Sequence, residues 1–359
     1  MARSALVTAG RAPAALEWVR SLAGRGWTVY VADSYRYTMS AYSRYVTGVV
    51  RVPPPREEPE RFRRAVHGLI KNLRLDLVVP TCEEVFYLAD LHPAVFCSNL
   101  ELLRRLHSKW TFLNCARGCG VEIPESSWCN ARSELPEDLE NLVFKLEYSR
   151  FGEGTTVGRA PTRYPCLAQQ RLRGPELSGY GIALEGKLKA WSLYEPVHRI
   201  AGASGIFFRP RQQTAARNFA QALVEKLGYH GQIAFDFMQT VEGLFVLECN
   251  PRATSGVHLL SEGPAGVFDG EEPQQAPTDR YLGPATPLAL SPGLFRDLPG
   301  AAEVVREPGD RRPLLGVAMH SLEAVWRSLR YRQSLKQAMT RDLEWDGEPL
   351  SIPGLEAEV

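Results

Sequence analysis

The sequence predicts an α/β fold, with an N-terminal doubly wound domain and a second part organised around a β-hairpin. The chain opens with an apolar run at 4–9, helical spacing at 14–22 and a second apolar run at 26–33. Strand, helix and strand in this order are typical of a doubly wound domain. Further along, two apolar runs in 231–250 flank Thr240-Val241-Glu242-Gly243, which predicts a hairpin.

Composition narrows the class of protein. The chain has 359 residues and 44% apolar residues, enough for two or three subdomains. A net charge of +1 gives no reason to expect nucleic acid or an anionic membrane as partner. No apolar run reaches the ~20 residues of a membrane span, and the start is too short in its apolar part for a secretory signal. Seven scattered cysteines fit reduced thiols, so we expect a cytoplasmic protein.

Two features of the N-terminal domain bear on ligands. Its first turn, Thr8 to Pro13, has one glycine instead of Gly-x-Gly-x-x-Gly, which disfavours a nicotinamide oxidoreductase. The strand at 76–80 is followed by Glu83 and Glu84. Ligands of open α/β sheets bind just past the carboxyl ends of strands, so both acids are candidate substrate residues. Alternatively, they cap the helix that starts there, since acids are favoured at that end.

The next stretch suggests a phosphate-binding device. Lys109 opens a helix, and Lys145 lies within the apolar strand 142–146. The loop after this strand holds small and cationic residues: Ser149, Arg150, Gly152 and Gly154. Loop N–H groups can close over phosphoryl oxygens while an ammonium neutralises charge. The loop lacks the Gly-Lys-Ser/Thr of a Walker loop, and an ordinary hairpin turn would also explain its glycines.

The hairpin brings acids to one end of an apolar ladder. With its turn at 240–243, Asp236 lies beside Leu247 and Glu248, and Glu248 and Asn250 share one strand face. Buried acids are costly unless they are paired or bind a cation, and hard oxygen ligands suit Mg²⁺ that bridges to substrate phosphates. Arg252 adds a positive charge just past the strand. Alternatively, Asp236 faces solvent and Glu248 simply ends its strand.

The order of these parts resembles the ATP-grasp superfamily, of the carboxylate–amine ligase type and similar to the biotin carboxylase and carbamoyl-phosphate synthetase fold. The resemblance covers roughly residues 1–260. It is carried, in order, by Lys109, Gly120-Val121-x-x-Pro124, Lys145, Gly174-x-Glu176, Asp236 and Glu248-x-Asn250-x-Arg252. Leu146 stands where the commonest pattern has proline. The resemblance implies an ATP-grasp fold behind an N-terminal Rossmann-like pre-ATP-grasp domain.

The resemblance also implies a division of the chain. We expect the pre-ATP-grasp domain at 1–107, a small lid subdomain at 108–174, and a large subdomain with the metal site at 175–290. Residues 291–359 would form a C-terminal extension. Past residue 262 the Gly/Pro-rich sequence predicts loop or a partly mobile segment, followed by a helix at 321–339 and a polar tail at 344–359.

Individual roles follow from the same resemblance. ATP is expected to bind through Lys109, Lys145, Ser149, Arg150, Gly152, Gln169, Arg171, Leu172 and Glu176, with Arg171 and Leu172 at the adenine and Glu176 on the ribose hydroxyls. Mg²⁺, for which Mn²⁺ can substitute, is expected on Asp236, Glu248 and Asn250. The catalytic cations would be Lys145 and Arg252. Candidate substrate residues are Glu83, Glu84, Arg199, Ser204, Ser255 and His258.

The implied activity is an ATP-dependent ligase that joins a carboxylate to an amine through an acyl phosphate and releases ADP and phosphate. Arg199 suits a carboxylate and Glu83 or Glu84 an amine, which favours amino-acid-like substrates. Alternatively, Arg199 pairs with a surface acid and His258 is a core histidine. The alternative functions are an ATP-grasp kinase or carboxylase, or a non-catalytic nucleotide-binding protein. A homodimer is a further alternative to a monomer.

Overall fold

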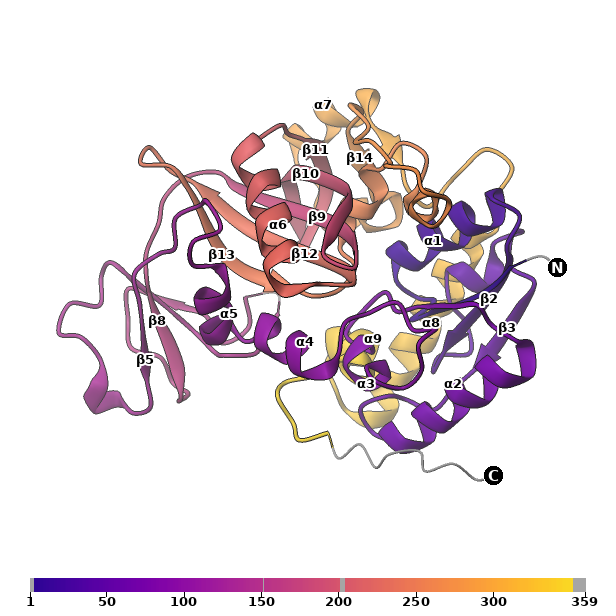
Figure 1. The fold of residues 1–359 in the computed structure, drawn as a ribbon, viewed down its shortest axis with the longest axis horizontal. Helices are drawn as coiled ribbons and strands as arrows, with labels where there is room; N and C mark the ends of the chain where they lie inside the picture. The colour runs from indigo at the N-terminus through magenta and orange to yellow at the C-terminus, as the bar shows by residue number, and fades with distance from the viewer. Residues whose placement is uncertain (1–2, 151, 201–203, 351–359) are drawn as a thin grey trace.

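The computed structural model describes residues 3–150, 152–200 and 204–350. It is built from helices and three β-sheets, in agreement with the predicted α/β class. A four-stranded sheet near the N-terminus and a second four-stranded sheet, here called the lid sheet, lie at opposite ends of the molecule (Figure 1). A seven-stranded sheet lies between them.

The N-terminal sheet is parallel and has the strand order β3-β2-β1-β4. Its apolar strands are buried on both faces, as expected for a parallel sheet covered by helices. The helix after β1 begins with Pro13, whose fixed φ suits the first helical position. The elements are β1 (Ser4–Thr8), α1 (Pro13–Gly24), β2 (Thr28–Asp33), β3 (Gly48–Arg51), α2 (Pro59–Leu73), β4 (Leu77–Val79), α3 (Val85–Leu88) and α4 (Leu100–His107).

The lid sheet is small and antiparallel, with the order β5-β8-β6-β7. A core of Cys129, Phe144, Cys166 and Ala168 holds it together. Helix α5 (Lys109–Ala116) leads into it and is capped by Ser108, whose Oγ accepts from the backbone N–H of Thr111 at 3.1 Å. The strands are β5 (Ser126–Cys129), β6 (Leu142–Lys145), β7 (Thr156–Val157) and β8 (Cys166–Gln170).

The seven-stranded sheet has the order β13-β12-β9-β10-β11-β14-β15. Helix α6 covers it, with Phe219 packed edge-on against Phe235 and Phe237. That helix ends at Gly228, at φ +59°, as the sequence indicates. The elements are β9 (Glu176–Leu184), β10 (Lys187–Ile200), β11 (Ser204–Pro210), α6 (Thr214–Leu227), β12 (Gly231–Gln239), β13 (Leu244–Asn250), β14 (Arg280–Tyr281) and β15 (Ala302–Glu303).

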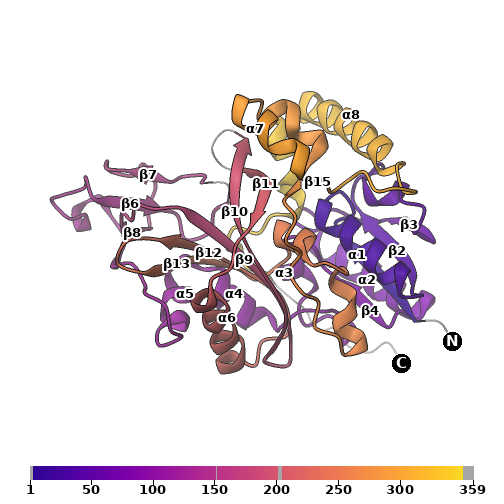
Figure 2. The same cartoon turned by 90° about the horizontal axis from the view of Figure 1, so that it is seen from above.

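The chain past residue 262, where the sequence predicts a loop, contains regular secondary structure. Short 3₁₀ turns and strands β14 and β15 join it to the seven-stranded sheet, because apolar residues such as Leu294 and Val305 are buried there. Three helices follow: α7 (Pro292–Asp297), α8 (Pro313–Tyr331) and α9 (Leu335–Thr340). Figure 2 shows α8 beside the N-terminal sheet. The expected polar tail is described only as far as residue 350.

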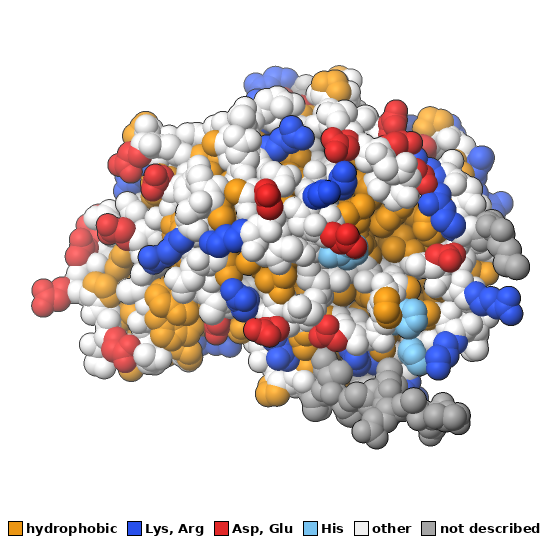
Figure 3. Space-filling view, in the orientation of Figure 1, with side chains coloured by type: hydrophobic (Ala, Val, Ile, Leu, Met, Phe, Trp, Pro, Cys, Tyr) orange, Lys and Arg blue, Asp and Glu red, His pale blue; other side chains and the backbone are white. Residues whose placement is uncertain are grey.

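The surface carries acidic and basic side chains in a mixture (Figure 3), as expected from the net charge of +1. Acidic and basic side chains are interspersed with apolar ones over the face shown in Figure 3. None of the helices within the described ranges combines the length and apolarity that a bilayer span requires.

A buried arginine ties the C-terminal segment to the first sheet. Arg11, in the turn after β1, donates through Nε to Asp33 at the end of β2 (3.0 Å) and through NH1 to Asp342 (2.7 Å). The three side chains are 5%, 2% and 10% exposed. Buried charges of this kind are tolerated only when they are paired, so the turn that lacks the dinucleotide glycines holds a structural cation instead.

We expect Arg11→Ala to lower the free energy of unfolding by about 3–5 kcal/mol, because it leaves Asp33 and Asp342 buried without their cation. Urea unfolding followed by circular dichroism measures this. The control is Arg64→Ala, which removes a surface pair with Glu60 and should cost less than about 1 kcal/mol. Equal effects of the two changes would contradict a structural role for Arg11.

The same pair gives a pH dependence. Burial alone favours the neutral form of Asp342, but Arg11 outweighs burial and lowers the pKa of Asp342 below its usual value. A lowered pKa in the folded state means that this contribution is present at neutral pH and is lost as pH falls through that pKa. The stability difference between wild type and Arg11→Ala should therefore shrink in acid.

Candidate active site

The hairpin of β12 and β13 has the register that the sequence predicts. The ladder pairs Asp236 with Glu248 and Ala234 with Asn250, and a bulge follows Asp236. The turn closes where expected, with the Thr240 N–H donating to the Gly243 carbonyl at 2.9 Å. Phe235 and Phe237 fill the core beneath the ladder. The apolar residues therefore fix the register, and the register brings the two acids side by side.

The acids at the end of the hairpin are held by neighbouring polar groups. Ser178 Oγ donates to Asp236 Oδ1 at 2.8 Å, and Asn250 Nδ2 donates to Asp236 Oδ2 at 3.3 Å. Lys109 Nζ lies 3.4 Å from Glu248 Oε2. Burial and the Glu248 charge raise the pKa of Asp236 to about 7. Burial opposes ionisation of Glu248 as well, but Lys109 and Lys145 lower the pKa of Glu248 below its usual range.

This donor set fits a divalent cation. Two adjacent carboxylates and the Asn250 side-chain oxygen are hard ligands of the kind Mg²⁺ prefers, and a cation would remove the repulsion that raises the pKa of Asp236. Within the described ranges, no group of three His, Cys, Asp or Glu residues could hold a metal. A magnesium ion here would therefore complete its shell with water or phosphate oxygens, which is its usual behaviour.

Two lysines approach the acids from different elements. Lys109, in the first turn of α5, donates from Nζ to the Ser149 carbonyl at 2.9 Å. Lys145, at the end of β6, donates to Gln169 Oε1 at 2.8 Å. Burial lowers the pKa of Lys145, while Glu248 acts in the opposite direction. The cations thus come from the lid side and the acids from the seven-stranded sheet.

A cavity of about 570 Å³ opens between these groups. It is lined by predicted site residues from the lid and from the seven-stranded sheet. They are Lys109, Lys145, Ser149, Arg150, Gly152, Glu176, Arg199, Ser204, Asp236, Glu248, Asn250, Arg252 and Ser255. The structure therefore brings most of the predicted residues together in one place.

The predicted adenine-binding stretch lies outside this lining. Gln169 Oε1 accepts a hydrogen bond from Lys145 Nζ at 2.8 Å. The Arg171 backbone N–H donates to the Asn141 carbonyl at 2.8 Å within the lid. Leu172 follows in the connection to β9. None of the three lines the cavity.

Glu83 joins four parts of the chain instead of lining the cavity. Its carboxylate accepts from Arg150 Nε (2.8 Å) and from the Trp345 backbone N–H (3.1 Å), and Arg252 Nε lies 3.3 Å away. Burial opposes the charge, but Arg150 outweighs it and lowers the pKa of Glu83 to about 2. Glu83 is thus buried, paired with two arginines and absent from the lining of the cavity, which gives no support to the expectation that it binds an amine substrate.

Glu84 also lies outside the lining of the cavity. It is fully buried and accepts from Thr8 Oγ1 at 2.6 Å and from the backbone N–H groups of Thr81 and Cys82 at 2.8 and 2.9 Å. These N–H groups precede α3, which begins at Val85, and Glu84 makes no side-chain capping hydrogen bond to that helix, so the carboxylate holds the turn after β4 and does not cap the helix. Burial raises the pKa of Glu84, and its hydrogen bonds act in the opposite direction.

Arg199 and Glu176 were assigned to different ligands, and they contact each other. Both line the cavity, and the guanidinium NH2 is hydrogen-bonded to Glu176 Oε2. Residues 201–203 of the glycine-rich stretch after Arg199 lie outside the described residues. Arg199 is thus paired with an acid, as in the alternative considered, but that acid belongs to the same cavity.

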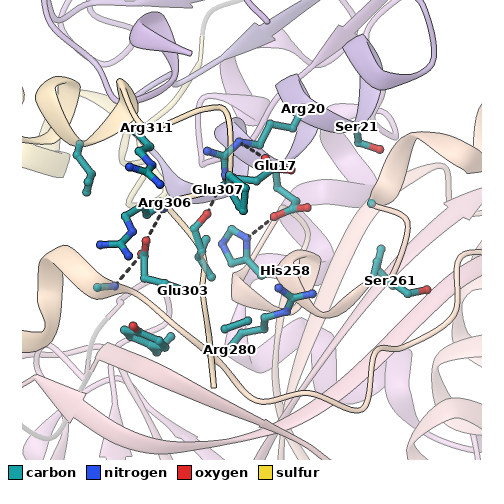
Figure 4. A pocket seen from close by; sticks show the side chains of 18 of the residues that line it. Glu17, Arg20, Ser21, His258, Ser261, Arg280, Glu303, Arg306, Glu307 and Arg311 are labelled. Carbon is teal, nitrogen blue, oxygen red and sulfur yellow. Dashed lines mark hydrogen bonds and ion pairs between the residues drawn. The ribbon is translucent and has the colours of Figure 1, made fainter. Parts of the chain in front are cut away.

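His258 lies in a different cavity, of about 1270 Å³ (Figure 4). Its Nδ1 is 3.0 Å from Glu17 Oε2 on α1, and its ring stacks on Phe208. His258 therefore does not line the cavity that holds Asp236 and Glu248, where most of the predicted residues meet. The 3₁₀ helix Ser255–Leu259 leaves Ser255 on one side and turns His258 to the other.

The cavity of about 570 Å³ that holds Asp236 and Glu248 is also lined by residues that the sequence did not single out. Tyr194, Phe208 and Thr254 line it, as does Ser178, which is bonded to Asp236. Ser178 could have been found, because it stands two residues after Glu176 on β9 and so shares its face. Tyr194 on β10 and Phe208 on β11 come from positions that only the folded sheet brings together, whereas Thr254 directly precedes Ser255 in the chain.

Comparisons with known proteins bear on the fold. No protein-family profile and no curated protein matches the sequence. N5-carboxyaminoimidazole synthetase from Staphylococcus aureus complexed with ADP superposes with a TM-score of 0.63 at 14% identity, over 83% of this chain and 86% of that one. The L-amino acid ligase from Bacillus licheniformis gives 0.56 at 14% identity, over 71% and 68%.

A third structure shares the arrangement. The biotin carboxylase domain of the Hydrogenobacter thermophilus 2-oxoglutarate carboxylase, a dimer with MgADP and bicarbonate, gives a TM-score of 0.56 at 12% identity, over 72% of this chain and 66% of that one. At such low identities the likeness concerns the fold. Together with the arrangement of the sheets and the hairpin, it shows that this chain has the ATP-grasp fold.

Proposed function

We propose that the protein is an ATP-dependent ligase that joins a carboxylate to an amine through an acyl phosphate. The single observation that carries the proposal is the meeting of Asp236 and Glu248 with Lys109 and Lys145 in one cavity. Phosphoryl transfer depends on positioning and charge neutralisation more than on covalent chemistry by the protein. This group of residues supplies both, and similar folds include an L-amino acid ligase.

In this proposal the lysines bind phosphate and the acidic residues bind the metal ion. Lys109 and Lys145 would hold phosphate oxygens, and Asp236, Glu248 and Asn250 would hold Mg²⁺. Bound Mg²⁺ neutralises charge on the transferred phosphoryl group. A substrate carboxylate oxygen would bond to the γ-phosphorus as the bond to ADP breaks, and the amine would then displace phosphate. Arg252, near the acids and adjacent to Glu83, would offset the negative charge that develops.

Substrate recognition rests on Arg199. Its guanidinium can bind a carboxylate with two parallel hydrogen bonds, and it lies in the same cavity as the acids. We propose that Glu176 turns to the ribose hydroxyls when ATP binds and that the acid substrate then takes its place at the NH2 group of Arg199, whose Nε donates to the Pro196 carbonyl at 3.3 Å. Because Glu83 and Glu84 are occupied elsewhere, the amino-acid-like character of the substrates now rests on Arg199, with Ser204 and Ser255 beside it.

A second candidate function is ATP-dependent carboxylation. The biotin carboxylase domain with MgADP and bicarbonate shares the fold, and bicarbonate is itself a small carboxylate. ADP release that requires bicarbonate would favour this reaction, whereas release that requires both an organic acid and an amine would favour the ligase. A non-catalytic nucleotide-binding protein would have no need of the paired acids.

All seven cysteines are free thiols, and we propose a cytoplasmic enzyme on that basis.

Glu248→Gln should abolish turnover and leave the fold intact, because the apolar ladder that fixes the hairpin remains. We expect ADP release to fall by about a hundredfold or more, and binding of Mn²⁺, followed by electron paramagnetic resonance, to weaken. The matched control is Glu242→Gln in the exposed turn of the same hairpin, which should change neither. Normal Mg²⁺-dependent activity in Glu248→Gln would refute the metal assignment.

Lys145→Ala should weaken ATP binding and slow the chemistry, because a partly buried ammonium beside the acids is lost. Calorimetry gives the ATP affinity, and ADP release gives the rate. Lys187→Ala, an exposed lysine at the start of β10, is the control and should behave as wild type. If Lys145→Ala keeps both the affinity and the rate, Lys145 is only a strand residue.

Arg199→Ala should raise the KM of the acid substrate tenfold or more, since loss of a charge-assisted hydrogen bond costs about 1.5–3 kcal/mol. The ATP affinity should stay nearly unchanged. Screening an amino-acid matrix for ADP release identifies the substrate first. Arg211→Ala removes a comparable pair with Glu195 at the surface and serves as control. An unchanged KM for both co-substrates would remove Arg199 from the site.

A further inference from the structure

Helix α8 turns its large apolar side chains away from the protein. Leu315, Leu322 and Leu329 are 55%, 65% and 76% exposed, and Val325 and Trp326 are 45% and 57% exposed. Figure 2 shows α8 at the periphery of the molecule, lying along the N-terminal part of the fold. An isolated exposed leucine is ordinary, but a continuous apolar stripe along one helix indicates an interaction surface.

The inner face of α8 carries the small and polar residues. Gly316, His320 and Ala324 are buried against the N-terminal domain. A Cβ on Gly316 would lie 2.7 Å from the Thr38 carbonyl oxygen, so only glycine allows this close approach. Glu323, on the same side, accepts from the Tyr37 N–H at 3.1 Å and from Arg327 NH2 at 2.8 Å. A surface helix normally shows the reverse distribution, with its large apolar side chains inside.

The outward residues have the spacing of a coiled-coil seam. Leu315, Leu322 and Leu329 are seven residues apart, and Ala318 and Val325 each follow a leucine by three. These are the a and d positions of a heptad repeat. The flanking positions are uncharged: Met319, Ser321, Trp326 and Ser328. The surface therefore matches another helix of the same kind.

We propose that this face, formed by Leu315, Ala318, Leu322, Val325 and Leu329, binds the α8 helix of a second copy of this chain. In an antiparallel pair, a positions face d positions of the other helix. Leu329 would then pack against Ala318, and Leu322 against Val325, so large residues meet small ones. A two-fold interface of this kind uses the same patch on both copies.

Charge supports the second copy as occupant. The central seam brings no like charges together, because its flanking positions carry none. Glu323 and Arg327 are committed to each other within one chain. Arg312 and Arg330 lie towards the ends of the helix, where solvent screens them, and the Arg330 guanidinium lies over the Tyr331 ring. A helix that binds a membrane surface carries its cations along the flanks of the apolar face, which α8 does not.

A groove beside the seam adds contact area. It has a volume of about 830 Å³, and its walls include Met319, Leu322 and Trp326 on one side and Tyr37 and Pro53 on the other. A stable dimer buries about 800 Å² per partner, more than a seam of two heptads provides. Side chains that flank the partner's seam can fill this groove, so the seam and the groove together form the interface.

Sedimentation velocity of the full chain tests the proposal. We expect wild type to sediment as a dimer at about 10 µM and to dissociate on dilution, as an interface of this size allows. Leu322→Glu should be a monomer at the same concentration, with at least a tenfold weaker self-association. At a concentration low enough for wild type to be monomeric, the two proteins should have the same thermal midpoint, because the Leu322 side chain is exposed and its loss leaves the monomer fold intact. Val241→Glu, an equivalent change at the exposed hairpin turn, should remain a dimer.

Two results would overturn the proposal. One is a wild type that stays monomeric across this range, and the other is a Leu322→Glu variant that still dimerises. Co-sedimentation with vesicles of phosphatidylserine and phosphatidylcholine identifies a competing occupant. Monomeric wild-type protein that binds such vesicles and loses binding in Leu322→Glu would assign the face to a membrane surface. The readouts are independent of ATP, so their failure leaves the proposed ligase activity unaffected.

Discussion

The structure depends on two carboxylates that face each other across an apolar ladder. The register that buries Phe235 and Phe237 also places Asp236 beside Glu248, so the repulsion between the acids is a consequence of the core. Such a pair is stable only with positive charge close by. Lys109 and Lys145 supply it from α5 and β6, which explains why the lid must lie against this end of the hairpin. A divalent cation with nucleotide phosphates would complete the same balance of charge.

A second centre of charge organises the surroundings of the cavity. Glu83 follows the N-terminal sheet, Arg150 belongs to the lid loop and Arg252 follows the hairpin, and all three meet near Trp345 of the C-terminal segment. Because each partner is largely buried, removing one leaves the others uncompensated. The C-terminal segment is thus part of the body that holds the cavity, although it lies far from it in sequence.

The sequence was informative where the structure is local. The turn at 240–243 and the alternation of side chains determine the hairpin register, and Gly228 marks the end of α6. The pairing of Arg11 with Asp342 joins residues 331 positions apart, and no periodic pattern reveals such a contact. Glu84 shows a different limit, since the sequence suggested a ligand or a helix cap and the carboxylate instead accepts from the turn at Thr81 and Cys82. For His258, the direction of a single 3₁₀ turn decided the cavity that it faces.

The attachment of the lid loop has a consequence for how this fold can be recombined. Arg150 contacts Asp346, and Glu153 in the same loop pairs with Lys336 on α9, at 2.8 and 3.1 Å. Two ion pairs therefore join the loop expected to close over phosphates to a segment that lies nearly two hundred residues later in the chain. The lid and the C-terminal segment therefore form one structural unit, and a chimera that exchanged the lid alone would lose both contacts and leave Glu83 with Arg252 as its remaining arginine partner.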